Sequence, residues 1–215
     1  MSKPPLMPTH PSHGHQEDTL ANAVAYRALS RGEDFPIRPV NRLDRDTSGV
    51  VLFSKHRLAA ARLAWEMAGG MMQKQYIALT RPAPCPLHGR IHLPIARVPQ
   101  SVMLRQVTPG GEEAITDYRT VVADKGIAAL AVFPKTGRTH QIRVHLSHIG
   151  APILGDFLYG KEDPCIGRQA LHARALSFFH PMTGEKLEIL APLPQDMAAL
   201  LPPDFEMLLA ALDRA

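Results

Sequence analysis

The spacing of apolar residues along the chain predicts a small number of short helices. Asp18 and Thr19 precede Leu20, Val24 and Ala28, which fall on one helical face, and this helix is expected to end near Gly32. The other segments with helical spacing or helix-ending residues are 56–68, stopped by Gly69-Gly70, 138–149, stopped by Gly150 and Pro152, and 204–212. Twenty prolines in 215 residues make long uninterrupted helices improbable.

Strand-like segments are more numerous than helices. Residues 114–123 and 127–133 flank Asp124-Lys125-Gly126 and so predict a β-hairpin. The other predicted strands are 50–54, 72–80, 89–98, 171–179 and 186–190. This order of elements predicts an α+β fold with a mainly antiparallel sheet.

Composition is that of a globular protein. The chain has 45% hydrophobic residues, which is enough for a core in one domain or in one elongated two-lobed unit. Its two cysteines, Cys85 and Cys165, are far apart, which argues against a disulfide framework and a cysteine-based zinc site. No signal peptide is evident and no apolar run approaches the ~20 residues that a membrane helix needs. We therefore expect a cytoplasmic protein, most simply a monomer, with no membrane partner.

Positive charge gathers in one part of the chain. The formal net charge is +4, and residues 38–62 hold six basic side chains against two acidic ones, which is also a balance of +4. Such a cluster suits a phosphate backbone. The alternative for Arg57 and Arg62 is an ordinary solvated helix face.

Two segments within this pattern carry the candidate chemistry. The run Asn41-Arg42-Leu43-Asp44-Arg45-Asp46-Thr47-Ser48-Gly49 places a carboxylate between two arginines just before an apolar strand. About a hundred residues later, Thr136-Gly137-Arg138-Thr139-His140-Gln141-Ile142-Arg143 supplies another arginine from a predicted helix. A carboxylate that must stay ionised beside an organic substrate needs a fixed cation, and these segments can provide the pair.

Five segments in this order resemble the signature of the RluA-type pseudouridine synthases, which isomerise uridine to pseudouridine within RNA. They are 41–49, Lys74-Gln75-Tyr76-Ile77-Ala78, 137–145, Gly155-Asp156-Phe157-Leu158-Tyr159-Gly160, and 171–181, which reads LHARALSFFHP. The resemblance implies one catalytic domain over 1–215, with a mixed sheet whose central RNA-binding cleft is flanked by helices. It also implies an rRNA or tRNA substrate, and a reaction that needs no cofactor and no metal. The Pro- and His-rich start of the chain predicts an irregular loop over 1–17.

The chain departs from the family pattern in two places. Asn41 stands where the family usually has histidine. This puts in doubt any role of the family's histidine ring, but it does not affect the role expected for Asp44. The chain also begins inside an early family segment, with no S4-type RNA-binding domain before it. We expect either a minimal catalytic domain or a shortened N-terminus.

The resemblance assigns roles to the central residues. Asp44 is the expected catalytic carboxylate, acting as a nucleophile at C1′ or as a base at C2′, and Arg143 is the cation expected to pair with it. Tyr76 is expected to lie against the uracil and reach C5 or a relay to it, and Ile142 to close the other side of the pocket. The alternatives are a structural ion pair or a turn cap for Asp44, and core packing for Tyr76 and Ile142.

Other arginines are predicted to hold RNA. Arg42 is expected to fill the gap left by a flipped nucleotide or to bind its phosphate, with a surface salt bridge to Asp46 as the alternative. Arg45 and Arg138 are weaker candidates for phosphate contacts.

Two other classes of function compete with this interpretation. One is an RNA-binding protein that keeps the fold without catalysis, although binding alone has no need of Asp44, Tyr76 and Arg143 together. The other is a metal-dependent hydrolase built on the eleven histidines, among them the groups His10, His13 and His15 and His140, His145 and His148. Neither group has metal-site spacing with an acidic partner, so we expect no metal site and place the N-terminal group in a flexible or RNA-facing loop.

Overall fold

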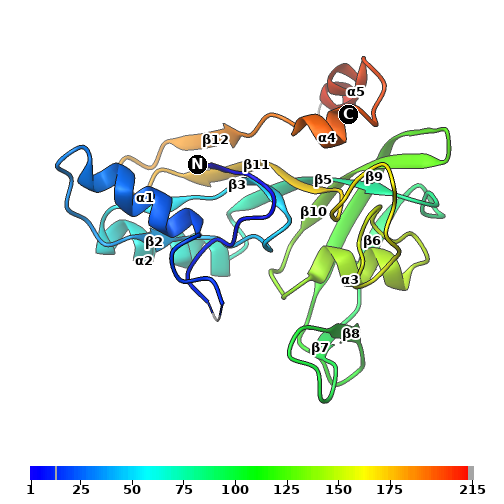
Figure 1. Cartoon of the computed structure of the whole chain (residues 1–215), viewed down its shortest axis with the longest axis horizontal. Helices are drawn as coiled ribbons and strands as arrows, with labels where there is room; N and C mark the ends of the chain where they lie inside the picture. Colours follow the sequence, from blue (N-terminus) through cyan, green and yellow to red (C-terminus); the bar gives the residue numbers. More distant parts are fainter. Residues whose placement is uncertain (13, 213–215) are drawn as a thin grey trace. The chain divides into compact units, whose positions relative to one another are not determined.

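The computed structural model describes residues 1–12 and 14–212 (Figure 1). Contacts divide the chain into two compact units. Unit 1 is Met1–Gln73 with Ala173–Pro192, and unit 2 is Lys74–His172 with the chain from Leu193 onward. The prediction of one catalytic domain over 1–215 stays a prediction.

The strands of unit 1 pair antiparallel where their registers are defined. Its strands are β1 (Ser2–Lys3), β2 (Arg38–Pro39), β3 (Ser48–Val50), β4 (Phe53–Ser54), β11 (Leu171–Phe179) and β12 (Lys186–Leu190). β3 lies between β1 and β11, β12 pairs with β11, and β2 pairs with β4. The predicted strand 50–54 is therefore wrong as one element. It breaks because the Leu52 N–H bonds the Asn41 side chain, at 2.8 Å.

The helices of unit 1 confirm the predicted starts and stops to within a few residues. Helix α1 (Leu20–Leu29) is capped by Thr19, whose hydroxyl accepts the Asn22 N–H at 3.3 Å, while the Asn22 side chain accepts the Thr19 N–H. Helix α2 (Arg57–Ala68) ends at Gly69. The buried residues that pack together in this unit are Val50, Leu63, Met72, Leu176, Phe178 and Ala191.

Unit 2 contains neighbouring strands of one sheet and a large apolar core. In order across the sheet, they are β5 (Gln73–Thr80), β10 (Ile127–Pro134), β9 (Ile115–Asp124) and β6 (His88–His92), all antiparallel (Figure 1). The predicted hairpin is confirmed, with Ile127 opposite Asp124 and a register shift between Ala129 and Leu130. The core of this unit also contains residues of α3 (Gln141–His148), α4 (Gln195–Ala198) and α5 (Phe205–Leu212).

Two predicted elements of unit 2 have different bounds in the structure. The predicted strand 89–98 is two strands, because Pro94 has no N–H for a ladder and the chain leaves the sheet to form β7 (Ile95–Arg97). β7 pairs with β8 (Arg105–Val107) in a hairpin that extends away from the sheet (Figure 1). The predicted helix 138–149 begins only at Gln141, because His140 is left-handed, with φ 57°, and the Gln141 side chain holds the Arg138 N–H at 3.0 Å.

The predicted fold class is confirmed: the protein is α+β with a mainly antiparallel sheet. Residues 1–17 contain β1 and an isolated bridge between Ser12 and His15, and His13 lies outside the described residues. Within 1–12 and 14–212, no helix combines the length and hydropathy needed to cross a membrane.

Candidate active site

The loop that carries Asp44 is held from several sides within unit 1. The Thr9 hydroxyl donates to the Leu43 carbonyl at 3.0 Å and accepts the Leu43 N–H at 3.2 Å. The Thr47 N–H donates to the Asp44 carbonyl at 3.1 Å, which closes the turn after the carboxylate. Asp44 itself is partly exposed. The backbone around the predicted catalytic acid is therefore fixed, while its side chain keeps access to solvent.

Lys3 fixes the same loop with a buried ammonium group. Its side chain is 1% exposed, and Nζ donates to the carbonyls of Pro4, Met7 and Arg45 at 2.8, 2.7 and 2.8 Å. Charge-assisted bonds of this kind are stronger than neutral ones. Lys3 thus ties the start of the chain to the residue that follows Asp44. The only sign of this role in the sequence is the position of Lys3 in an early family segment.

Asn41, which departs from the family pattern, has a structural role here. Its amide nitrogen donates to the Val50 carbonyl at 3.0 Å, and its oxygen accepts the Leu52 N–H at 2.8 Å. The side chain therefore replaces a strand partner and anchors the beginning of the Asp44 loop. Gly49 anchors its end: it has φ 118°, and a Cβ there would lie 2.2 Å from the Ala173 carbonyl oxygen.

The arginines of this loop face solvent. Arg42 Nη1 lies 3.3 Å from His10 Nε2, and Arg45 Nε lies 3.7 Å from Asp46 Oδ1. Both arginine side chains are exposed, as a phosphate-binding role requires. The sequence did not predict the contact of Arg42 with His10.

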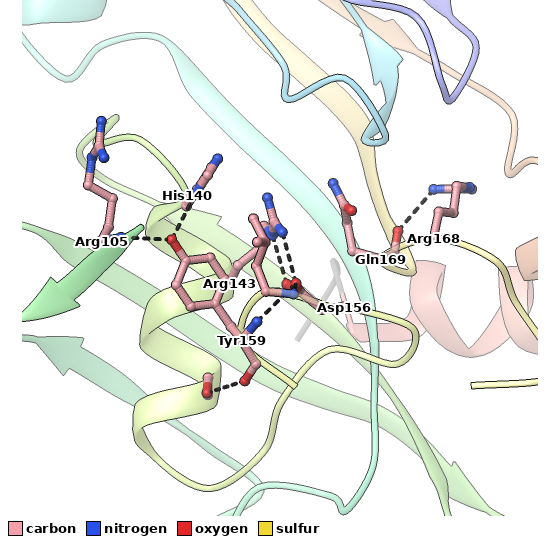
Figure 2. A network of polar contacts seen from close by, with 9 residues as sticks. Arg105, His140, Arg143, Asp156, Tyr159, Arg168 and Gln169 are labelled. Atoms are coloured by element: carbon pink, nitrogen blue, oxygen red, sulfur yellow. Dashed lines mark hydrogen bonds and ion pairs between the residues drawn. The ribbon is translucent and has the colours of Figure 1, made fainter. Parts of the chain in front are cut away.

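Arg143 lies in unit 2 and is almost completely buried. Its side chain is 3% exposed and that of Asp156 is 0% exposed. Nε and Nη2 of Arg143 donate to Oδ2 and Oδ1 of Asp156 at 2.7 and 2.8 Å, in a side-on bidentate pair (Figure 2). Asp156 Oδ1 also accepts the Leu158 and Tyr159 N–H groups at 3.0 and 3.3 Å. The guanidinium is therefore anchored to a turn that is itself hydrogen-bonded.

Tyr159 covers the same guanidinium. The Arg143 Cζ atom lies 5.2 Å from the centre of the Tyr159 ring, within the range of a cation–π contact (Figure 2). The sequence comparison included both Asp156 and Tyr159 in one matching segment but gave them no role. Their signal was the glycine-bounded segment Gly155–Gly160, in which Gly155 has φ 72° and a Cβ would lie 2.3 Å from the Arg168 carbonyl oxygen.

Helix α3 is held in place by two polar side chains on either side of Arg143. The Gln141 amide nitrogen donates to the Ile115 carbonyl and to the Thr116 hydroxyl, both at 2.9 Å. His145 is fully buried, with Nδ1 2.9 Å from the Thr116 hydroxyl and Nε2 2.9 Å from the Leu93 carbonyl oxygen. Burial lowers the pKa of His145, so the ring is neutral at physiological pH. These contacts fix the helix against β9 and so fix the backbone of Arg143.

The remaining predicted site residues of unit 2 lie on β5 and α3. Tyr76 is half-buried on β5, opposite Val132, and packs against the core. Ile142 is 6% exposed and belongs to that core, as its alternative interpretation stated. Arg138 is exposed and donates to Glu112 Oε2 at 2.6 Å and to the Glu113 carbonyl at 2.9 Å. The catalytic and RNA-contacting roles of these residues stay predictions.

Lys74 was part of the matched segment around Tyr76 but received no role from the sequence. Its ammonium group lies near Gly137, at 3.7 Å from the position a Cβ would take there. Burial lowers the pKa of Lys74 from its ordinary value. The segment before α3 therefore has a partly desolvated cation beside it.

Within the described parts of the chain, no three or more His, Cys, Asp or Glu side chains are grouped to hold a metal ion. The predicted pairing of Asp44 with Arg143 joins residues of different units and stays a prediction.

Comparison with known proteins defines the class of protein. The family model of RNA pseudouridylate synthases matches residues 1–148, so the chain belongs to this family, as the RluA-type resemblance predicted. The protein is thus an RNA pseudouridine synthase, an isomerase that acts on RNA.

Individual relatives agree with this assignment. The chain is 40% identical to the uncharacterized RNA pseudouridine synthase YjbO of Bacillus subtilis, over 94% of this chain and 71% of the relative. It is 37% identical to ribosomal large subunit pseudouridine synthase D of Zymomonas mobilis, over 97% of this chain and 69% of the relative. The solved structure of human RNA pseudouridylate synthase domain containing 1 has a TM-score of 0.72 at 26% identity, covering 92% of this chain and 86% of that one.

Proposed function

We propose that the protein converts a specific uridine of rRNA or tRNA to pseudouridine, with Asp44 as the catalytic carboxylate and Arg143 as its cation. The observation that carries this proposal is the buried, doubly fixed guanidinium of Arg143. A buried cation held this rigidly is suited to orient a second carboxylate, since orientation of reacting groups supplies much of an enzyme's rate enhancement.

The geometry of the Arg143–Asp156 pair bears on how reactive Asp44 would be. Asp156 accepts hydrogens of Nε and Nη2, and we assign the same guanidinium to Asp44 as its cation. A group of two carboxylates and one guanidinium has a net charge of −1 when both acids are ionised. Arg143 would therefore orient Asp44 by hydrogen bonds without cancelling its negative charge. That charge stabilises the positive charge that develops at C1′ as the glycosidic bond breaks.

The isomerisation is balanced without a co-reactant. The C1′–N1 bond breaks, the uracil turns, and a C1′–C5 bond forms; C5 loses its proton and N1 gains one. We assign the ribose step to Asp44, as nucleophile at C1′ or as base at C2′. Tyr76 is assigned to the face of the uracil and to the transfer of the C5 proton, directly or through a relay, and Ile142 to the other wall of the base pocket.

Arginine side chains are assigned to the RNA itself. We propose that Arg42 occupies the gap left by the flipped uridine or binds its phosphate, and that Arg45 and Arg138 bind neighbouring phosphates. The solvent exposure of these three side chains supports this assignment. The large-subunit rRNA activity named for the Zymomonas mobilis relative makes that RNA the first substrate to test.

The test uses large-subunit rRNA transcripts and bulk tRNA labelled with [5-³H]uridine, because loss of the C5 proton releases tritium. Wild-type protein should release tritium from one of these RNAs. Asp44→Asn should abolish the release while RNA affinity by filter binding is unchanged or tighter. Turnover by Asp44→Asn near the wild-type rate would exclude Asp44 from the chemistry. Mapping of pseudouridine in cellular RNA with and without the gene identifies the uridine.

A further inference from the structure

Tyr159 connects four segments of unit 2 around Arg143. Its ring lies over the guanidinium, and its carbonyl accepts the Ser147 hydroxyl at 2.6 Å. Its hydroxyl oxygen lies 2.9 Å from the Arg105 backbone nitrogen and 2.8 Å from His140 Nδ1 (Figure 2). The segments joined are α3, the residue just before α3, β8, and the turn after Asp156.

We propose that Tyr159 is a positioning residue that holds Arg143 in its productive orientation and links this orientation to the β7–β8 hairpin. The inference rests on the proposed role of Arg143. Asp156 bonds the guanidinium along one edge only. A planar group held along one edge can still swing about that edge, and the Tyr159 ring, whose centre lies 5.2 Å from Arg143 Cζ, limits this motion. Asp156 and Tyr159 therefore restrict different movements of the same group.

The hydroxyl of Tyr159 has a separate task. The hydroxyl oxygen accepts the Arg105 N–H. The hydroxyl proton is not used in this bond and remains available for a different partner. Burial raises the pKa of Tyr159, so the phenol keeps its proton near neutral pH. The hydroxyl also bonds His140 Nδ1: it donates when Nδ1 carries no proton and accepts when Nδ1 is protonated.

This bond stabilises an unusual backbone. His140 has φ 57°, in the left-handed region that residues other than glycine seldom adopt. The two rings also meet edge to face, with centroids 5.6 Å apart and planes at 73°. The hydroxyl thus fixes the residue just before α3, three positions before Arg143. Through the Arg105 N–H it couples this start to β8.

The ring and the hydroxyl can be tested separately. Tyr159→Phe keeps the ring over Arg143 and removes both hydroxyl bonds, whereas Tyr159→Leu removes both contributions. The assay is the single-turnover rate of tritium release from the labelled RNA that serves as substrate, with RNA affinity by filter binding. We expect a roughly 10-fold lower rate for Tyr159→Phe and roughly 100-fold lower for Tyr159→Leu, with affinity changed less than about threefold.

Tyr118→Phe is the matched control. Tyr118 is a buried tyrosine of unit 2, and its hydroxyl donates to the Pro86 carbonyl at 3.0 Å. Its variant loses one hydroxyl bond outside the Arg143 surroundings and should keep the wild-type rate. Thermal unfolding shows whether Tyr159→Leu folds. If it does not fold, the test rests on Tyr159→Phe. A wild-type rate for a folded Tyr159→Phe overturns the role of the hydroxyl.

A second background separates positioning from a merely structural role. In Arg143→Lys, the planar guanidinium that Tyr159 covers is gone, so adding Tyr159→Phe should lower the remaining rate by less than about threefold. A full additional 10-fold loss would show that Tyr159 does not act through Arg143. A wild-type protein that releases no tritium, or an active Asp44→Asn, overturns the proposed function instead. An inactive Asp44→Asn beside a fully active Tyr159→Phe overturns only the present inference.

Discussion

The Arg143–Asp156 pair offers the most direct quantitative test of how unit 2 is stabilised. Both side chains are at most 3% exposed and share a bidentate contact. Asp156→Asn preserves the shape of the side chain and an oxygen for the Leu158 N–H, but it removes the carboxylate that holds the buried Arg143 guanidinium by two bonds. Breaking a buried pair in this way costs about 3–5 kcal/mol. We expect the lower end, about 3 kcal/mol, because the asparagine oxygen still accepts hydrogen bonds.

The measurement is urea unfolding of the full chain, followed by far-UV circular dichroism. With a denaturant slope of about 2 kcal/mol/M, a loss of about 3 kcal/mol lowers the midpoint of the unit 2 transition by about 1.5 M. The double variant Arg143→Met with Asp156→Asn removes both charges and should recover much of the loss.

An exposed pair serves as the control. Arg90 Nε and Nη2 donate to Asp117 Oδ1 and Oδ2 at 2.7 and 2.9 Å, but the two side chains are 62% and 26% exposed. Because solvent screens this pair, Asp117→Asn should shift the midpoint far less than Asp156→Asn does. Equal shifts for the two variants would refute the reasoning, as would a double variant no more stable than Asp156→Asn alone.

Two further predictions concern groups that hold the site in place. Because burial lowers the pKa of His145, the folded chain binds fewer protons than the unfolded chain as the pH falls below about 6.5. The His145 contribution to the free energy of unfolding should therefore be fully present above about pH 6.5 and decline below it. His145→Gln should flatten this decline between about pH 5 and 7 in urea midpoints, and an unchanged slope would contradict the assignment. Lys3→Met removes three charge-assisted bonds to carbonyls and should lower the free energy of unfolding by roughly 1.5–3 kcal/mol. The control is Lys125→Met, which should leave the free energy of unfolding unchanged because the native Lys125 side chain is 90% exposed. Similar losses for Lys3→Met and Lys125→Met would rule out a special role for Lys3.

Local sequence signals predicted much of the fold. The capped helix α1, the β9–β10 hairpin and the strand β11 all lie close to where their patterns placed them. Each depends on contacts between residues near in sequence, or on a regular alternation that one buried face imposes. The family motifs likewise predicted the class of enzyme, since they are short ordered segments visible in the chain itself.

The failures in prediction share a physical cause. The strand over 50–54 breaks at Leu52 because the Asn41 side chain takes its N–H, and α3 starts late because Gln141 takes the Arg138 N–H. In both cases a side chain competes with the backbone for a hydrogen bond. Such competition depends on which groups come together in space, so a periodic pattern does not reveal it.

The sequence alone determined the kind of chemistry: its ordered motifs identified the family, and the types of residue in them identified a carboxylate, a cation and an aromatic ring. Only the tertiary structure showed that Asp156 binds Arg143 along one edge, that Arg143 Cζ lies over the Tyr159 ring, and that Lys3 bonds the loop of Asp44. These contacts join residues separated by 13, 16 and 42 positions. Their strength comes from burial and from exact hydrogen-bond geometry, which the folded chain creates and the linear order of residues does not contain.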